Sequence, residues 1–259
     1  MSNEAIDLAT VVEFLNRELS VRDFKDSAHN GLQIESSQKR ISTIGFAVDS
    51  GLSVLEEAVR RKCELLVVHH GVMWGEVEPV VGTWAKKLTL CLTRGLSLYA
   101  AHLPLDSHLT LGNAAVIAKD VLNAENIQPE FEYHGKTIGV RATLAQPTPL
   151  EAISKLLGGC DGAINPPLVL PFGKQMISSV GIATGSATFL IPDAARLGLD
   201  LLISGEPKQQ AYHTAKESSQ SVICMGHYGS ETFGVRALQR VLTQRFGVKT
   251  EWIHEPTGI

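Results

Sequence analysis

Three short segments of the chain place histidine and carboxylate side chains at spacings that could bind metal ions. They are His69-His70-Gly71, His102 followed by Asp106, and His227 followed by Glu231. Histidine nitrogens and carboxylate oxygens together are ligands for zinc, manganese or iron. Even without His102, three histidines with two carboxylates exceed the needs of one tetrahedral ion. They suit two divalent ions roughly 3.5–4 Å apart, joined by a carboxylate or a water.

Each of these segments follows a short apolar run that we predict to be a strand. The runs Leu65–Val68, Leu96–Ala101 and Val222–Met225 are of the kind that is buried on both faces of a parallel sheet. In open α/β sheets, ligands bind at the carboxyl ends of the strands, because the chain leaves the sheet there and side chains can converge. We therefore expect the three segments to meet at such an edge.

Helical and extended patterns alternate along the chain. Apolar residues recur at helical spacing over residues 8–19, a strand pattern covers Ile41–Val48, and Leu52–Arg61 again has helical spacing. This alternation predicts an α/β fold. Further helices are predicted at 113–122, 150–157, 191–197 and 231–246, and further strands at 137–144, 177–183 and 201–203.

The second half of the chain resembles the first. Residues 41–70 align without a gap on residues 177–206 at a shift of 136, and nine of the 30 positions are identical. We interpret this as a duplicated α/β unit, although unrelated β-α-β units also share glycine, alanine and leucine. The pair His102 and Asp106 is related to the pair His227 and Glu231 by a shift of 125 residues instead of 136. This difference predicts 11 extra residues in the first repeat, in the loop Val72–Lys86. We expect a first repeat at 1–128, a second at 129–259, and the metal site in the cleft between them.

Composition excludes several classes of protein. Hydrophobic residues make up 44% and charged residues 19% of the chain, as in ordinary globular proteins. The net charge of −4 offers no general basic face, so nucleic acid is not expected as the main partner. No apolar run is long enough to cross a membrane, and acidic residues near the N-terminus argue against a secretory signal, so we expect a cytoplasmic protein. The four cysteines form no CxxC motif, and no GxGxxG, Walker or GxSxG motif is present.

Several motifs together resemble one known family. They are Asn30-Gly31-Leu32-Gln33, His69-His70-Gly71 with Trp74, Ala101-His102-Leu103-Pro104-Leu105-Asp106, Leu111-Gly112-Asn113, Gly226-His227-Tyr228 with Glu231, and Phe233-Gly234. In this order, from Asn30 to about Leu242, the chain is similar to the GTP cyclohydrolase 1 type 2 homologues, also called Nif-three-like proteins.

The resemblance implies an α/β fold of two intertwined α/β structural repeats, three-layer α/β/α with mixed sheets. It also implies a dinuclear metal centre and a toroidal homohexamer. Motif matching gives His69, His70, Asp106, His227 and Glu231 as the metal ligands. The connector between the repeats is too short for the inserted domain of larger family members, so the chain resembles the compact form.

Two hypotheses for the function remain open at this point. The first is a metal-dependent hydrolase of a small, nucleotide-like substrate, with two divalent ions (zinc, iron or manganese) and a bridging hydroxide as the nucleophile. His102 would transfer protons or orient a ligand, or else make a structural hydrogen bond. Trp74 or Tyr228 could stack a base, or simply pack. The second hypothesis is a non-catalytic metal-binding scaffold or regulatory interaction protein.

Overall fold

The computed structural model describes residues 5–76 and 78–259, and its contacts divide the chain into two compact units. Unit 1 comprises Met1–Leu105 and Val235–Glu255, and unit 2 comprises Asp106–Gly234 and Pro256–Ile259. Each unit is thus built from two separate stretches of chain, as the expectation of intertwined repeats requires. The boundaries differ from the predicted division after residue 128, because residues 106–128 belong to unit 2 and the C-terminal strand belongs to unit 1.

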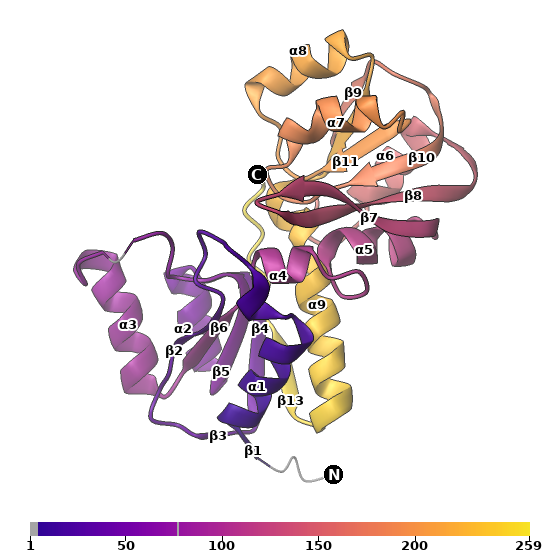
Figure 1. Ribbon diagram of the computed structural model, residues 1–259. Helices are drawn as coiled ribbons and strands as arrows, with labels where there is room; N and C mark the ends of the chain where they lie inside the picture. Colours follow the sequence, from indigo (N-terminus) through magenta and orange to yellow (C-terminus); the bar gives the residue numbers. More distant parts are fainter. Residues whose placement is uncertain (1–4, 77) are drawn as a thin grey trace. The chain divides into compact units, whose positions relative to one another are not determined.

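Unit 1 contains a mixed sheet with helices on both faces (Figure 1). Its elements are β1 (Ile6–Asp7), α1 (Leu8–Glu18), η1 (Val21–Asp23), β2 (Gly31–Ile34), β3 (Arg40–Ile41), β4 (Thr43–Asp49), α2 (Leu52–Arg60), β5 (Leu65–His70), α3 (Gly82–Arg94), β6 (Ser97–Ala100) and β13 (Lys249–Trp252). The strand order is β13-β4-β5-β6-β2, parallel except for β2 at one edge. Helices α2 and α3 pack on one face through Leu55 and Cys91. On the other face the Tyr99 hydroxyl donates to Asn16 of α1.

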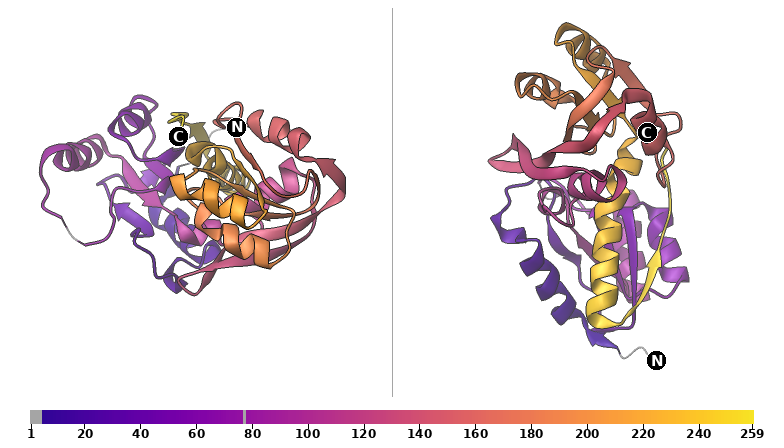
Figure 2. Two further views of the ribbon diagram at one scale, coloured as in Figure 1. Left: turned by 90° about the horizontal axis from the view of Figure 1, so that it is seen from above. Right: turned by 90° about the vertical axis from the view of Figure 1, so that its right-hand side faces the viewer.

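Unit 2 has the same layered arrangement around a second mixed sheet (Figure 2). Its elements are α5 (Asn113–Val116), η2 (Ile117–Val121), β7 (Glu125–Tyr133), β8 (Lys136–Pro149), α6 (Leu150–Gly158), β9 (Leu168–Pro171), β10 (Met176–Ile182), η3 (Thr188–Leu190), α7 (Ile191–Arg196), β11 (Leu201–Ser204), α8 (Gln209–Glu217) and β12 (Ser221–Cys224). The order is β7-β8-β10-β11-β12-β9. Residues of α5, η2 and α6 form the core on one face, and residues of α7 and α8 form it on the other. The predicted three-layer α/β/α fold is confirmed.

Two helices contribute residues to both units. They are α4 (Leu103–Asp106), which ends at the boundary of unit 1, and α9 (His227–Phe246), whose first eight residues belong to unit 2. Within unit 1, the Phe246 ring of α9 meets the Phe14 ring of α1 edge-on at 5.6 Å between centroids. The end of α9 therefore helps to cover the sheet of unit 1.

The two sheets share a common four-stranded part, β4-β5-β6-β2 and β10-β11-β12-β9. Leu65 pairs with Ile44 in the first repeat and Leu201 with Val180 in the second, which reproduces the shift of 136. The third strands, β6 and β12, are related by a shift of 124 residues, since Leu65 also pairs with Ser97 and Leu201 with Ser221. The histidines that follow these strands, His102 and His227, are related by a shift of 125. The one-residue difference lies after β12, where Gly226 adopts a φ of 94° before His227.

An acidic residue caps the first strand of each repeat. Glu64 accepts hydrogen bonds from the backbone N–H groups of Ser42 and Thr43. At the same shift of 136, Asp200 accepts them from Ser178 and Ser179 at 2.8 and 3.0 Å. This shared detail supports the duplication beyond the strand order, because nothing in the β-α-β pattern itself requires a carboxylate there.

We expect Asp200→Ala to lower the free energy of unfolding by about 3 kcal/mol, because two backbone N–H groups would lose a charged acceptor that is itself buried. Asp193→Ala is the matched control, since Asp193 pairs with Arg196 on the exposed surface of α7 and should cost less than about 0.5 kcal/mol. Urea denaturation measures both. Equal losses in the two variants would contradict the capping role.

Most of the predicted elements are present in the structure, and two of them differ at the ends that carry the candidate ligands. Strand β5 continues to His70, and α9 begins at His227 instead of Glu231. The predicted helix 113–122 is α-helical only to Val116 and then becomes a π-helical turn. Helices α3 and α8 and the edge strands were not predicted. Among the described residues, no helix is both long and apolar enough to span a bilayer.

Candidate metal centre

The last two residues of β5 are His69 and His70, and both rings are held at Nδ1. His69 Nδ1 lies 2.8 Å from the carbonyl oxygen of Ala101, which can only accept, so Nδ1 donates the hydrogen bond. His70 Nδ1 lies 2.8 Å from the carboxylate of Asp49 at the end of β4. An imidazole that donates from Nδ1 keeps a lone pair on Nε2, which is the form that binds metal.

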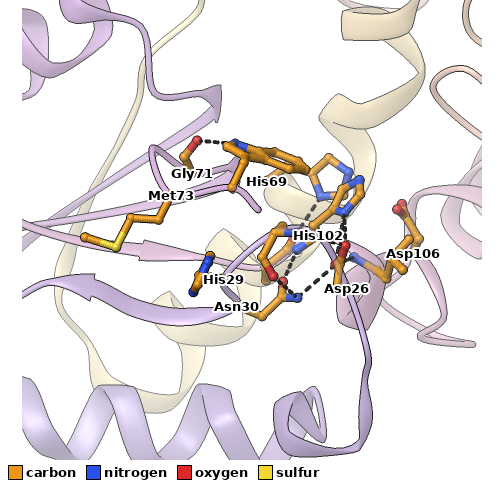
Figure 3. Close-up of polar contacts among 12 residues, drawn as sticks. Asp26, His29, Asn30, His69, Gly71, Met73, His102 and Asp106 are labelled. Atoms are coloured by element: carbon orange, nitrogen blue, oxygen red, sulfur yellow. Dashed lines mark hydrogen bonds and ion pairs between the residues drawn. The ribbon is translucent and has the colours of Figure 1, made fainter. Parts of the chain in front are cut away.

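His102 follows β6 and is held by a buried carboxylate (Figure 3). Its Nδ1 lies 3.0 and 3.1 Å from the two oxygens of Asp26, whose side chain is only 3% exposed. Asn30 bonds to the same carboxylate and also accepts from the His102 backbone N–H at 2.7 Å. Burial raises the pKa of Asp26, but the hydrogen bonds and charge of His102, with Asn30 and the Ala28 N–H, outweigh it and hold that pKa well below its usual range.

The three histidines form one cluster within unit 1. One ring nitrogen from each of His69, His70 and His102 lies within 4.8 Å of the other two. Because Nδ1 is held by an oxygen in every case, Nε2 is the ring nitrogen that could coordinate a metal ion. The donor set and its fixed tautomers therefore fit a divalent cation. His102, which the sequence placed outside the ligand set, has the same access to the cluster as His69 and His70.

The turn after His70 is held by Gln33. Gln33 Oε1 accepts from the backbone N–H groups of Val72 and Met73 at 2.7 and 3.1 Å. The turn passes so close to this side chain that a Cβ at Gly71 would lie 2.3 Å from Gln33 Oε1. Gln33 and Gly71 thus fix the backbone that directly follows the histidine pair.

In unit 2, Asp106 is oriented by Asn113. Asn113 Nδ2 donates to Asp106 Oδ1 at 2.9 Å, and Asn113 Oδ1 accepts from the Gly234 N–H at 2.7 Å. The Thr184 hydroxyl lies 3.4 Å from the same Asp106 oxygen. Asn113 is fully buried, so its amide holds the Asp106 carboxylate in one orientation.

The other acidic ligand candidate of unit 2 lies one helical turn after His227. His227 Nε2 is 3.2 Å from Glu231 Oε2, and His227 Nδ1 is 2.7 Å from Glu206 Oε2. Burial lowers the pKa of His227, but the hydrogen bonds and charges of Glu231 and Glu206 outweigh it and raise that pKa to about 9. A metal ion at Nε2 would replace the proton there, while Glu206 would keep Nδ1 in the donating form.

Gly185 follows β10 and touches the side chain of Glu231. It has a φ of 63°, and a Cβ there would lie 2.4 Å from Glu231 Oε1 and 3.2 Å from His227 Nε2. The Gly185 N–H donates to Ser230, which fixes this approach. The backbone at Gly185 thus limits where the Glu231 carboxylate can lie.

We expect Gly185→Ala to weaken metal binding at least tenfold, because the methyl group would displace the Glu231 carboxylate. Gly198→Ala is the matched control, since Gly198 has a φ of 69° but open space around its Cβ position. Both variants should lose about 1 kcal/mol of stability from the left-handed backbone. Isothermal titration with zinc or manganese measures the affinities. Equal affinities in both variants would contradict the role of Gly185.

The oxygen partners of the histidines were not predicted from the sequence. Asp26 lies in a segment with no distinguishing pattern, whereas Asp49 directly follows the predicted strand Ile41–Val48. Glu206 had a signal, because it aligns with His70 in the internal repeat. Of the two aromatic candidates, Tyr228 is buried and packs against Gly162, whereas Trp74 is 40% exposed.

Comparison with known proteins identifies the family of the chain. Residues 6–257 match the model of the family described as Duf34/NIF3 (NGG1p interacting factor 3). The chain belongs to this family. It is 37% identical to a GTP cyclohydrolase 1 type 2 homolog of Archaeoglobus fulgidus and 39% identical to one of Pyrococcus horikoshii, over 98% of this chain and 100% of each relative.

A solved structure from another organism shows the same fold over nearly the whole chain. The crystal structure of TTHA1606 from Thermus thermophilus has a TM-score of 0.90 and 34% sequence identity, and the match covers 98% of this chain and 100% of that one. The family resemblance seen in the motifs is therefore confirmed.

Proposed function

We propose that the chain binds two divalent metal ions through His69, His70, Asp106, His227 and Glu231, and that it hydrolyses a small, nucleotide-like substrate. The observation that carries this proposal is the histidine cluster of unit 1, in which every ring is held at Nδ1 by an oxygen and one ring nitrogen of each histidine lies within 4.8 Å of the other two. The name of the relatives, GTP cyclohydrolase 1 type 2 homolog, supports a hydrolase and a nucleotide-like substrate.

Different residues of the chain have different roles in the proposed reaction. Divalent ions held by these ligands would lower the pKa of coordinated water towards neutrality and offset negative charge on the substrate. Asp49 and Glu206 hold His70 and His227 in the metal-binding tautomer. His102 is our candidate for proton transfer, because its ring belongs to the cluster while Asp26 holds its orientation through Nδ1.

A turnover screen tests the proposal. Protein loaded with zinc, iron or manganese is incubated with nucleotides, phosphoesters and cyclic amides, and products are separated by chromatography. We expect hydrolysis of one class that requires the metal and falls at least 100-fold in Glu231→Ala. A protein that carries its full complement of ions and turns over none of these compounds would contradict the hydrolase and support the metal-binding scaffold. The hexamer and the location of the site in a cleft between the repeats stay predictions.

A further inference from the structure

A cavity of about 520 Å³ lies within unit 1 and is lined mainly by helix α3 and by residues from 72–76 and 78–80. Its lining includes two indoles, Trp74 and Trp84, and Met73 beside them. Three charged side chains also line it, Glu76, Glu78 and Lys87. The volume is in the range typical of small-molecule sites. None of the ligand positions proposed above lies in this cavity.

Trp74 connects the cavity to the histidine cluster. Its ring lies 5.1 Å from the His102 ring and 5.9 Å from the His70 ring, measured between centroids. A molecule in contact with Trp74 inside the cavity is therefore one side chain away from the proposed metal ligands. Such adjacency is what a substrate needs when one part of it is bound and another part reacts.

The wall that carries Trp74 is held in place by the protein itself. The Trp74 indole N–H donates to the Gly71 carbonyl at 2.8 Å, a bond drawn in Figure 3. The backbone of Trp74 forms an isolated antiparallel bridge with Ala28, and the Gly75 N–H donates to Ser27 at 2.7 Å. The indole is 40% exposed although its position is fixed. A fixed and exposed aromatic surface binds a partner at low cost in conformational entropy.

The segment that lines the cavity is longer than its counterpart in the second repeat. In the second repeat, residues 205–208 join β11 to α8, whereas residues 71–81 join β5 to the longer helix α3. The duplicated fold therefore forms without this segment. Trp74 on this longer segment and Trp84 on the first turn of α3 line one cavity next to the histidine cluster, which is more simply explained by a ligand than by folding.

We propose that this cavity binds a planar heteroaromatic ring of the substrate whose reacting part lies at the histidine cluster; the inference rests on the proposed function of that site. Indole surfaces favour planar rings, since stacking of a base on an aromatic side chain typically changes affinity tenfold to a hundredfold. Glu76 and Glu78 outnumber Lys87 among the charged lining residues. The cavity thus selects a neutral or cationic ring and leaves any phosphate outside it.

Calorimetric titration of the full-length, metal-free protein tests this ring site separately from the chemistry. We expect guanosine and adenosine to bind, and ribose 5-phosphate and inorganic phosphate not to bind. Trp84→Leu should weaken nucleoside binding at least tenfold, and Trp84→Phe should keep most of the affinity. Leu92→Ala, an exposed position on the same helix that does not line the cavity, is the control and should bind as the unaltered protein does.

Measurements of binding and of turnover distinguish a failure of the ring site from a failure of the proposed hydrolase. Nucleoside binding without turnover would support the ring site and contradict the hydrolase. Turnover whose KM is unchanged in Trp84→Leu would support the hydrolase and overturn the ring site. The ring site is also overturned if no nucleoside binds and Trp84→Leu changes the oligomeric state, because the cavity would then be a contact between copies of the chain.

Discussion

Glu231→Ala is expected to lower the affinity for divalent ions at least 100-fold, and His102→Ala to lower it only about 10–100-fold. Glu231 offers two carboxylate oxygens one turn into α9, and its side chain is only 4% exposed. Two oxygens would allow the carboxylate to contact both of the proposed ions, whereas His102 would offer one ring nitrogen. The loss of Glu231 would also remove charge that offsets the two cations.

The measurement is the metal content of both variants after dialysis against a weak chelator, with the free-ion concentration held constant. Glu206→Gln serves as a control, because it keeps a side chain that can accept from His227 Nδ1 and should retain most of the metal. If Glu231→Ala kept its ions while His102→Ala lost them, the assignment of Glu231 as a ligand and His102 as a proton-transfer residue would be wrong.

Removal of the ions is expected to lower the thermal midpoint by roughly 5–10 °C. A ligand that binds only the folded state at a hundredfold excess over its Kd stabilises that state by about 2.7 kcal/mol. In a chain of this size, 1 kcal/mol corresponds to roughly 2–4 °C. Each unit keeps its own apolar core in the absence of metal, so the circular dichroism spectrum should stay native-like.

Differential scanning calorimetry with and without chelator measures this shift, and Glu231→Ala is the matched comparison. In that variant the chelator should have little further effect, because the ions are already lost. A midpoint that does not respond to chelator in the unaltered protein would mean that ligands from the two stretches of sequence do not hold the same ions.

The main elements could be predicted because they depend on local patterns. Apolar runs such as Leu65–Val68 identify buried strands, and the polar groups that directly follow them are the candidate ligands, which stay a prediction. The internal repeat gave a second, independent prediction of how the strands pair. Its shift of 136 reproduced the pairing of Leu201 with Val180.

The remaining features depend on tertiary contacts that leave little local signal. Asp26 holds His102 across 76 residues of sequence, and its neighbours have no helical or extended pattern. The edge strands β2 and β9 are four residues long, too short for a reliable alternation. The position of α9 was predicted four residues late, because Gly229 and Ser230 interrupt an otherwise helical pattern.

The most direct test of the dinuclear site is elemental analysis of the full chain, purified without chelator and dialysed after incubation with zinc, iron or manganese. The protein concentration is taken from amino-acid analysis, so that the ratio of ions to chains is absolute. We expect two divalent ions per chain, and fewer than one in Glu231→Ala. A ratio near zero in the unaltered protein after metal addition would contradict the proposed centre.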